Sequence, residues 1–200
     1  MRAETATAPD AGATSKQREP RDRRRRVVVV ALAGVVLVAG LAWAWHWRTH
    51  PDIVPGNGAG MRMTLDDQRR SVFVTVTDPS PGEGETVRID SATPRMLQNT
   101  AEATVEFFVC RLDLRGANHS ALGAVGPRHF AGVCPDPVPV VEGTELAIGA
   151  EPPQQLLMRV VVESPGRLRI DGVDLTYTHG WQRGTQTVGP RLVIRSRMRP

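Results

Sequence analysis

Two cysteines and two histidines are the residues of this chain that most directly suggest chemistry. Cys110 and Cys134 are the only cysteines, and His119 and His129 lie between them. A thiol beside an imidazole is the arrangement of a cysteine nucleophile, and His129 stands five residues before Cys134. A single cysteine pair in an oxidising compartment forms a disulfide instead. We expect that bond, and its loop of 25 residues predicts a stabilisation of about 3.5 kcal/mol.

A hydrolytic triad is the second chemistry that the residue types suggest. Asp113, His119 and Ser120 supply a carboxylate, an imidazole and a hydroxyl. Adjacent His and Ser side chains project in different directions, and the chain has no G-x-S-x-G nucleophile sequence. We therefore predict no catalytic residue.

Metal binding is the third chemistry. His46 and His50 are four residues apart and share a helix face only if the helix continues to residue 50, where Pro51 follows and no third ligand is present. Asp171 and Asp174 lack the surrounding D-x-[DN]-x-[DN]-G pattern of a calcium loop, so turn formation explains them better. We predict neither a metal nor a cofactor.

An uncharged stretch near the amino terminus predicts a membrane-spanning helix. Residues 27–45 are 19 residues without a charge, and as a helix they extend over roughly 28 Å. Indole rings favour the boundary between lipid and water, and basic residues stay on the cytoplasmic side. The residues that predict the two ends and the direction of the span are Trp43, Trp45, Trp47 and Arg23, Arg24, Arg25, Arg26.

The charge distribution predicts a cytoplasmic amino terminus and an exported remainder. Eight basic residues precede the span, whereas Arg48 is the only one within a dozen residues after it. A signal peptide cleaved after Ala44 is the alternative, because Ala42 and Ala44 form an A-x-A pattern. The long apolar run and the tryptophan that would follow the cut favour an uncleaved signal-anchor.

Four segments follow from composition. We predict a disordered basic cytoplasmic tail (1–26), a transmembrane helix (27–47), a Pro- and Gly-rich spacer that lifts the domain off the membrane (48–70), and an exported β-domain (71–197). The tail has eight bases against four acids, whereas residues 51–200 have 16 arginines against 17 acids. The nearly neutral body predicts no binding to nucleic acid.

The exported segment alternates apolar and polar residues as strands do. An extra residue at Gly172 shifts the alternation, which predicts a bulge or tight turn there. We expect an all-β, immunoglobulin-like antiparallel sandwich with no helix after the membrane, and a barrel is the alternative. The eight predicted strands are 71–77, 86–90, 104–110, 144–150, 155–163, 167–171, 173–178 and 191–196.

A long loop and a hairpin tip are the predicted recognition elements. Residues 111–143 break the strand rhythm and contain His119 and His129, and long loops on rigid scaffolds often bind partners. In the hairpin, Trp181 is expected to fold back over apolar surface. Exposure of both Trp181 and Arg183 would instead indicate a contact surface.

Residues 172–190 and 152–160 resemble segments of uncharacterised single-pass, membrane-anchored proteins of high-GC Gram-positive bacteria. The resemblance covers mostly the last third of the chain and implies an exported β-domain, without an activity or site. The abundance of arginine over lysine is also typical of GC-rich coding DNA.

We therefore expect a non-enzymatic, membrane-tethered binding or scaffold domain of the cell envelope. Its expected partners are the lipid bilayer and an unidentified envelope protein or wall component, and no oligomeric state is predicted. An envelope hydrolase or metal-dependent enzyme that uses His119 and His129 is one alternative. An accessory subunit of a larger membrane complex, packed through Gly34, Gly40 and Ala44, is the other.

Overall fold

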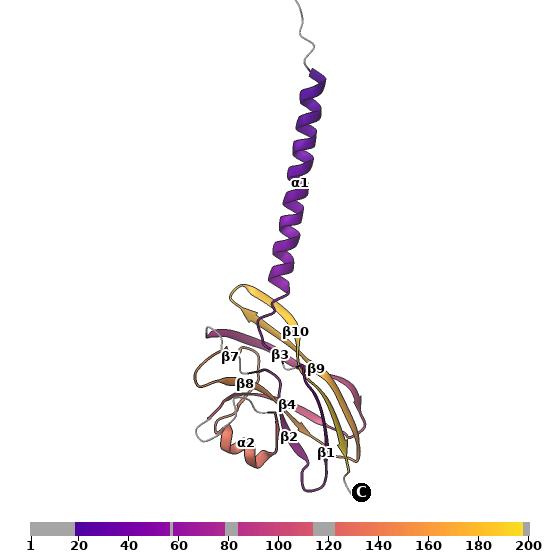
Figure 1. Ribbon diagram of the computed structural model, residues 1–200, viewed down its shortest axis with the longest axis vertical. Coiled ribbons are helices and arrows are strands. Elements are labelled where there is room, and N and C mark those ends of the chain that lie inside the picture. Colours follow the sequence, from indigo (N-terminus) through magenta and orange to yellow (C-terminus); the bar gives the residue numbers. More distant parts are fainter. Residues whose placement is uncertain (1–18, 57, 79–83, 114–122, 198–200) are drawn as a thin grey trace, which may run out of the picture. The chain divides into compact units, whose positions relative to one another are not determined.

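The structure is a computed structural model of the chain (Figure 1). The chain divides into two compact units, residues 1–44 and residues 45–200, and we call the second the β unit. The described residues are 19–56, 58–78, 84–113 and 123–197.

The first element, α1 (Glu19–Thr49), contains the apolar stretch. Its segment Val27–Thr49 has 23 residues, a mean hydropathy of 2.7 and no buried residues, so its apolar side chains are exposed on every side. At about 1.5 Å per residue it is roughly 35 Å long, enough to cross a bilayer core of about 30 Å. It is the one such helix among the described residues. The helix begins at Glu19, inside the predicted disordered tail, and residues 1–18 lie outside the described part of the chain.

Two five-stranded sheets make up most of the β unit (Figure 1). Neighbouring strands of the described residues are antiparallel, as predicted, except β1 and β10, which run parallel. Both sheets are open, and the described strands form no closed barrel. In spatial order, the first sheet contains β1 (Gly60–Leu65), β10 (Gln182–Ser196), β9 (Gly166–His179), β3 (Glu85–Asn99) and β7 (Thr144–Ile148). The second contains β5 (Ala124–Val125), β2 (Ser71–Thr75), β8 (Gln154–Val161), β4 (Thr104–Arg111) and β6 (Val138–Pro139).

One apolar core lies between the sheets. Alternating side chains of β2 and β8 in one sheet, and of β3, β9 and β10 in the other, belong to the same buried cluster. This alternation is the period of two that the sequence shows, since every second residue of a strand faces the same side. Aliphatic side chains dominate the cluster, and Tyr177 is its only fully buried ring.

The predicted irregularity at Gly172 is confirmed. Gly172 has φ +85°, a conformation that favours glycine. The register against β3 shifts between Pro94 and Met96, so that β9 has one extra residue there. Ile170 and Val173 are consequently both buried although their numbers differ in parity. The predicted strands 167–171 and 173–178 are therefore one continuous strand.

Four elements were not predicted: helix α2 (Pro127–Val133), strand β1 and the two-residue strands β5 and β6. Helix α2 contradicts the expectation of no helix after the membrane, and its apolar face consists of Phe130 and Val133. Phe130 stacks on Phe73 of β2 with ring centroids 3.6 Å apart, so tertiary packing stabilises this short helix. Strand β1 lies inside the segment predicted as a spacer.

Candidate interaction surfaces

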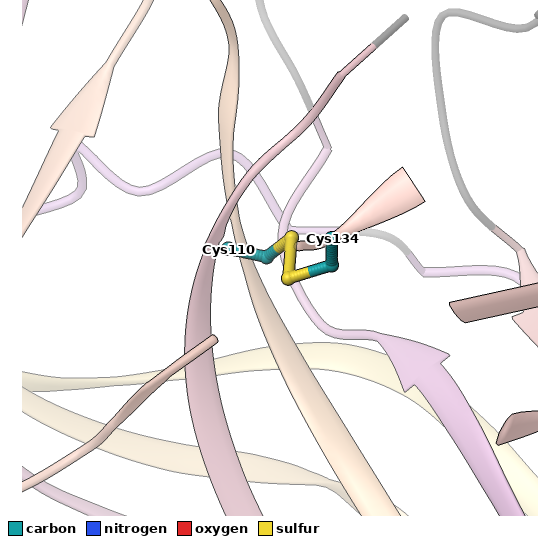
Figure 2. The surroundings of a disulfide bond; sticks show 2 residues. All are labelled: Cys110 and Cys134. Carbon is teal, nitrogen blue, oxygen red and sulfur yellow. A yellow bond between two sulfur atoms is a disulfide. The ribbon is translucent and has the colours of Figure 1, made fainter. Parts of the chain in front are cut away.

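The Cys110–Cys134 disulfide links the end of β4 to the residue after α2 (Figure 2). Both cysteines are almost completely buried, and they pack in a second apolar cluster with Phe73, Phe130 and Leu157. The disulfide predicted between Cys110 and Cys134 is therefore present. Because both sulfur atoms are bonded to each other, neither is a thiolate available to act with His129.

The predicted recognition loop, residues 111–143, contains short regular elements. Strand β5, helix α2 and strand β6 all fall within it. His119 lies in the segment 114–122, outside the described residues. His129 is exposed on α2.

A groove of about 870 Å³ lies between the β1–β2 turn and α2. We call it the arginine groove, because three arginines line it. Arg69 and Arg70 come from the turn, and Arg128 comes from α2 beside His129. The remaining lining residues are Thr64, Asp66, Gln68, Ser71, Gly126 and Pro127.

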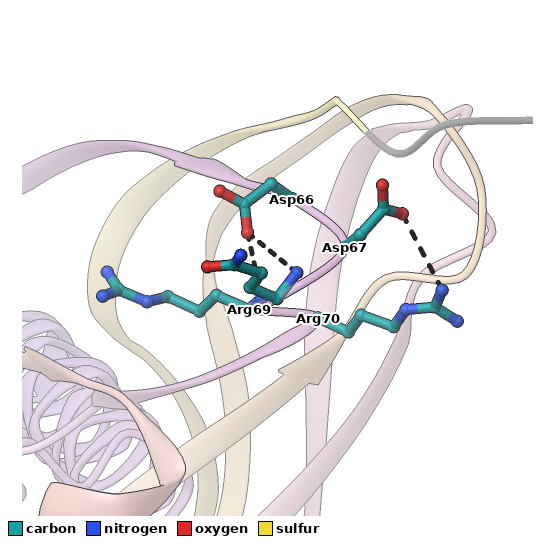
Figure 3. Close-up of polar contacts among 5 residues, drawn as sticks. Asp66, Asp67, Arg69 and Arg70 are labelled. Atoms are coloured by element: carbon teal, nitrogen blue, oxygen red, sulfur yellow. Dashed lines mark hydrogen bonds and ion pairs between the residues drawn. The ribbon is translucent and has the colours of Figure 1, made fainter.

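The turn at this groove is held by its own aspartates (Figure 3). One carboxylate oxygen of Asp66 accepts hydrogen bonds from the backbone N–H groups of Gln68 and Arg69, at 3.1 and 3.0 Å. Arg70 forms an ion pair with Asp67 at 3.8 Å. Arg69 and Arg70 leave the turn in opposite directions. Within the described residues, the guanidinium groups of Arg69 and Arg128 have no carboxylate partner, so positive charge is in excess in this groove.

A second groove, of about 900 Å³, lies between the edges of the two sheets beside the disulfide. Val109 and Arg111 of β4 form one side, and Thr144 and Glu145 of β7 form the other. Three carboxylates, of Asp113, Asp136 and Glu145, and one arginine, Arg111, line it, so negative charge is in excess there.

The β9–β10 turn exposes a tryptophan. His179 pairs with Gln182, and Gly180, with φ +56°, allows the tight turn between them. Trp181 is 72% exposed, so the expectation that it folds back over apolar surface is wrong. Arg183 is exposed as well and forms an ion pair with Asp90 at 3.0 Å.

The predicted recognition residues do not form one site. Figure 1 shows α2, which carries His129, and the β9–β10 turn at opposite ends of the β unit. The topology explains this separation: β1 runs parallel to β10, so the β1–β2 turn follows Leu65 at the end of β10 farthest from Trp181. The 14 residue steps from Gln182 to Ser196 correspond to roughly 45 Å of strand.

A polar clamp holds the chain that follows α1 against β9 and β10. The Tyr177 hydroxyl accepts a hydrogen bond from the Ile53 N–H at 3.1 Å, and the Pro51 carbonyl and Gln186 Oε1 lie within 3.1 and 2.8 Å as acceptors. The Gln186 amide donates to the Val54 carbonyl at 2.8 Å. Residues 51–54 therefore belong to the folded unit and are not a spacer.

The backbone of residues 49–51 also lies very close to β10, at Gly184. At Gly184 on β10, a methyl group would overlap the Thr49 carbonyl and the Pro51 ring. Glycine at this position therefore allows residues 49–51 to lie directly on the strand. Within the predicted spacer, 48–70, the clamp holds residues 51–54 and β1 occupies residues 60–65.

Tyr177 is the only tyrosine of the chain, which makes its ionisation measurable. Burial raises the pKa of its phenol above the ordinary value of 10.0. The unfolded chain then loses this proton before the folded chain does, so the contribution to stability is fully present below pH 10 and falls as the pH rises above it. We predict that phenolate absorbance in the near ultraviolet appears at higher pH for the native chain than for the chain in denaturant. Coincident titrations would contradict this.

The remaining candidate ligands have structural partners. The His46 and His50 rings stack at 4.2 Å. Asp171 pairs with Arg191 at 2.9 Å, and Asp174 accepts a hydrogen bond from the Thr187 hydroxyl at 2.7 Å. In the part of the chain that the structure describes, no three His, Cys, Asp or Glu residues cluster as metal ligands.

The arginine groove and the clamp were both missed from sequence. Arg69, Arg70, Pro51 and Asp52 fall in the range assigned to a spacer, and no local pattern pairs them with α2 or Tyr177. The adjacent arginines of the segment "DDQRR" were the one signal available. Comparison of the chain with known protein families, with curated proteins and with solved structures gives no match.

Proposed function

We propose that this chain is a non-enzymatic, membrane-anchored binding domain of the cell envelope, and that its arginine groove binds an anionic component outside the membrane. The observation that carries the proposal is the arginine groove, an excess of positive charge on a domain that is nearly neutral as a whole. Anions concentrate at such a site because guanidinium groups offer charge and several donors together.

The membrane part of the proposal is supported by α1. Its 23-residue apolar segment is exposed on all sides, and such a surface is stable in lipid rather than in water. The basic residues before the span favour a cytoplasmic amino terminus. The buried disulfide is in keeping with a β unit in an oxidising compartment.

The position of the groove suits this role. It lies at the end of the β unit opposite the β9–β10 turn (Figure 1), roughly 45 Å along β10. We expect the partner to be a polymer or protein in the layer outside the membrane.

We propose to test the groove with two polyanions, inorganic polyphosphate and poly-glutamate. The full chain in detergent micelles is titrated with each one, in a background with Arg23–Arg26 replaced by glutamine so that the tail does not bind. The variant Arg69→Ala/Arg128→Ala should weaken binding of the preferred polyanion about tenfold or more, because each 1.4 kcal/mol lost is a factor of ten. Binding should also weaken with added salt.

The matched control is Arg88→Ala/Arg95→Ala, which removes the same charge from exposed positions on β3, outside the groove. We expect it to change the dissociation constant by less than about twofold, since exposed charges act weakly at a distance. Equal weakening by both variants, or no binding of either polyanion to the parent chain, would overturn the proposal for the groove.

We keep two finer expectations as proposals. The immunoglobulin-like sandwich is supported by two sheets around one core, and the parallel β1–β10 pair is its departure from that architecture. Membership among the membrane-anchored proteins of high-GC Gram-positive bacteria rests on the resemblance of residues 152–160 and 172–190 alone.

A further inference from the structure

The exposed Trp181 is the feature of the β unit that the binding function leaves unexplained. At 72% exposure it is the most exposed large apolar side chain among the described residues of the unit. Indole rings are stable at the boundary of a bilayer, where the apolar ring contacts lipid and the N–H contacts headgroups.

Trp181 lies beside another tryptophan. Its ring meets the ring of Trp47 edge to face, with centroids 5.4 Å apart. The next residue, Gln182, donates a side-chain hydrogen bond to the Trp47 carbonyl at 3.0 Å. Both contacts lie within the β unit, so they do not depend on the placement of the first unit.

The depth of Trp47 in a bilayer follows from its position in α1. It is 20 residues after Val27, the first residue of the apolar segment, which is a rise of roughly 30 Å. This distance matches the hydrocarbon core, so Trp47 reaches the outer boundary of the core when Val27 lies at the inner one. The headgroup layer beyond that boundary is roughly 5 to 8 Å thick.

We propose that the β9–β10 turn is a membrane-contact site, in which Trp181 lies in the headgroup layer of the bilayer that α1 spans. If the full 5.4 Å between the two rings lay along the membrane normal, Trp181 would lie within that layer or at its outer edge. Arg183, two residues on, is 67% exposed at its side chain and suits contact with lipid phosphate. The inference rests on the proposed membrane anchor.

The clamp strengthens this inference, because it fixes the turn to the end of the helix. Tyr177 and Gln186, on the two strands of the hairpin, hold residues 51–54. The β unit is therefore joined to the membrane at two points, the helix end and the hairpin tip, rather than by a free linker.

The test uses full-length chains with one tryptophan each, in phosphatidylcholine and phosphatidylglycerol vesicles. One variant keeps Trp181 and carries Trp43→Phe, Trp45→Phe and Trp47→Phe, so that an aromatic ring remains at position 47. We expect its fluorescence to be quenched by spin-labelled lipid headgroups and shielded from aqueous iodide.

A matched variant has Leu97→Trp as its only tryptophan, with all four native ones replaced by Phe. Leu97 is 60% exposed, far along β3 from the turn, so we expect iodide quenching alone.

A third single-tryptophan chain, which keeps Trp45, separates the inference from the proposed anchor. Lipid quenching of Trp45 and Trp181 supports both. Lipid quenching of Trp45 with iodide-accessible, lipid-unquenched Trp181 overturns the membrane-contact site and leaves the anchor intact. No lipid quenching of either tryptophan overturns the anchor and the inference together.

Discussion

Replacing Cys110 and Cys134 with alanine should lower the free energy of unfolding of the β unit by about 3.5 kcal/mol. The bond closes a loop across 24 residues of sequence separation, and opening it restores entropy to the unfolded chain. The bond also fastens α2 to β4, and a seven-residue helix is unstable without such tertiary contacts. Urea unfolding of the full chain in detergent micelles measures the difference.

Two comparisons identify the bond as the cause. The single variant Cys110→Ala should lose about as much stability as the double variant, because either change removes the bond. A reducing agent should destabilise the parent chain and leave both variants unchanged. Equal urea midpoints for the parent and the double variant, with the same slopes, would contradict the account.

Two arginines in the middle of α1 should remove the protein from membranes. Leu37 and Val38 lie near the centre of the apolar segment, and the side chain of each is more than 60% exposed. Each arginine at the centre of a spanning helix costs about 2.5 to 3.5 kcal/mol, so Leu37→Arg/Val38→Arg should cost roughly 5 to 7 kcal/mol. Extraction of cell membranes with alkaline carbonate measures the outcome.

The matched control is Leu37→Val/Val38→Leu, which keeps the composition of the segment and should stay in the membrane pellet. Because both positions lie in the first unit and the sheets lie in the second, the circular dichroism of the sheets should be the same in both variants. Retention of the arginine variant in the pellet after the carbonate wash would show that α1 is not the anchor.

Local periodicity was enough to predict most of the strands. The central strands alternate between core and exterior, and this pattern is visible residue by residue, including its shift at Gly172. Strand β1 was missed because Met61 and Met63 are only partly buried and Leu65 alone is fully buried. Helix α2 was missed because its stability comes from Phe73 and the disulfide, which are distant in sequence.

The candidate surfaces were harder to predict than the strands. The disulfide could be predicted from the number of cysteines alone, because two cysteines allow only one bond within the chain. The arginine groove requires the β1–β2 turn to meet α2, and the clamp requires residues 51–54 to meet Tyr177 across more than 120 positions. Composition suggested a flexible spacer there, but long-range hydrogen bonds override local preference.

Cysteine labelling in intact cells tests the central claim, a membrane-spanning α1 with the β unit outside. The native cysteines are bonded and unreactive, so Leu97→Cys on the β unit and Ser15→Cys in the tail each supply the only free thiol. A membrane-impermeant maleimide should label Leu97→Cys in unbroken cells and Ser15→Cys only after lysis. Labelling of Ser15→Cys in unbroken cells, with Leu97→Cys protected until lysis, would contradict the account.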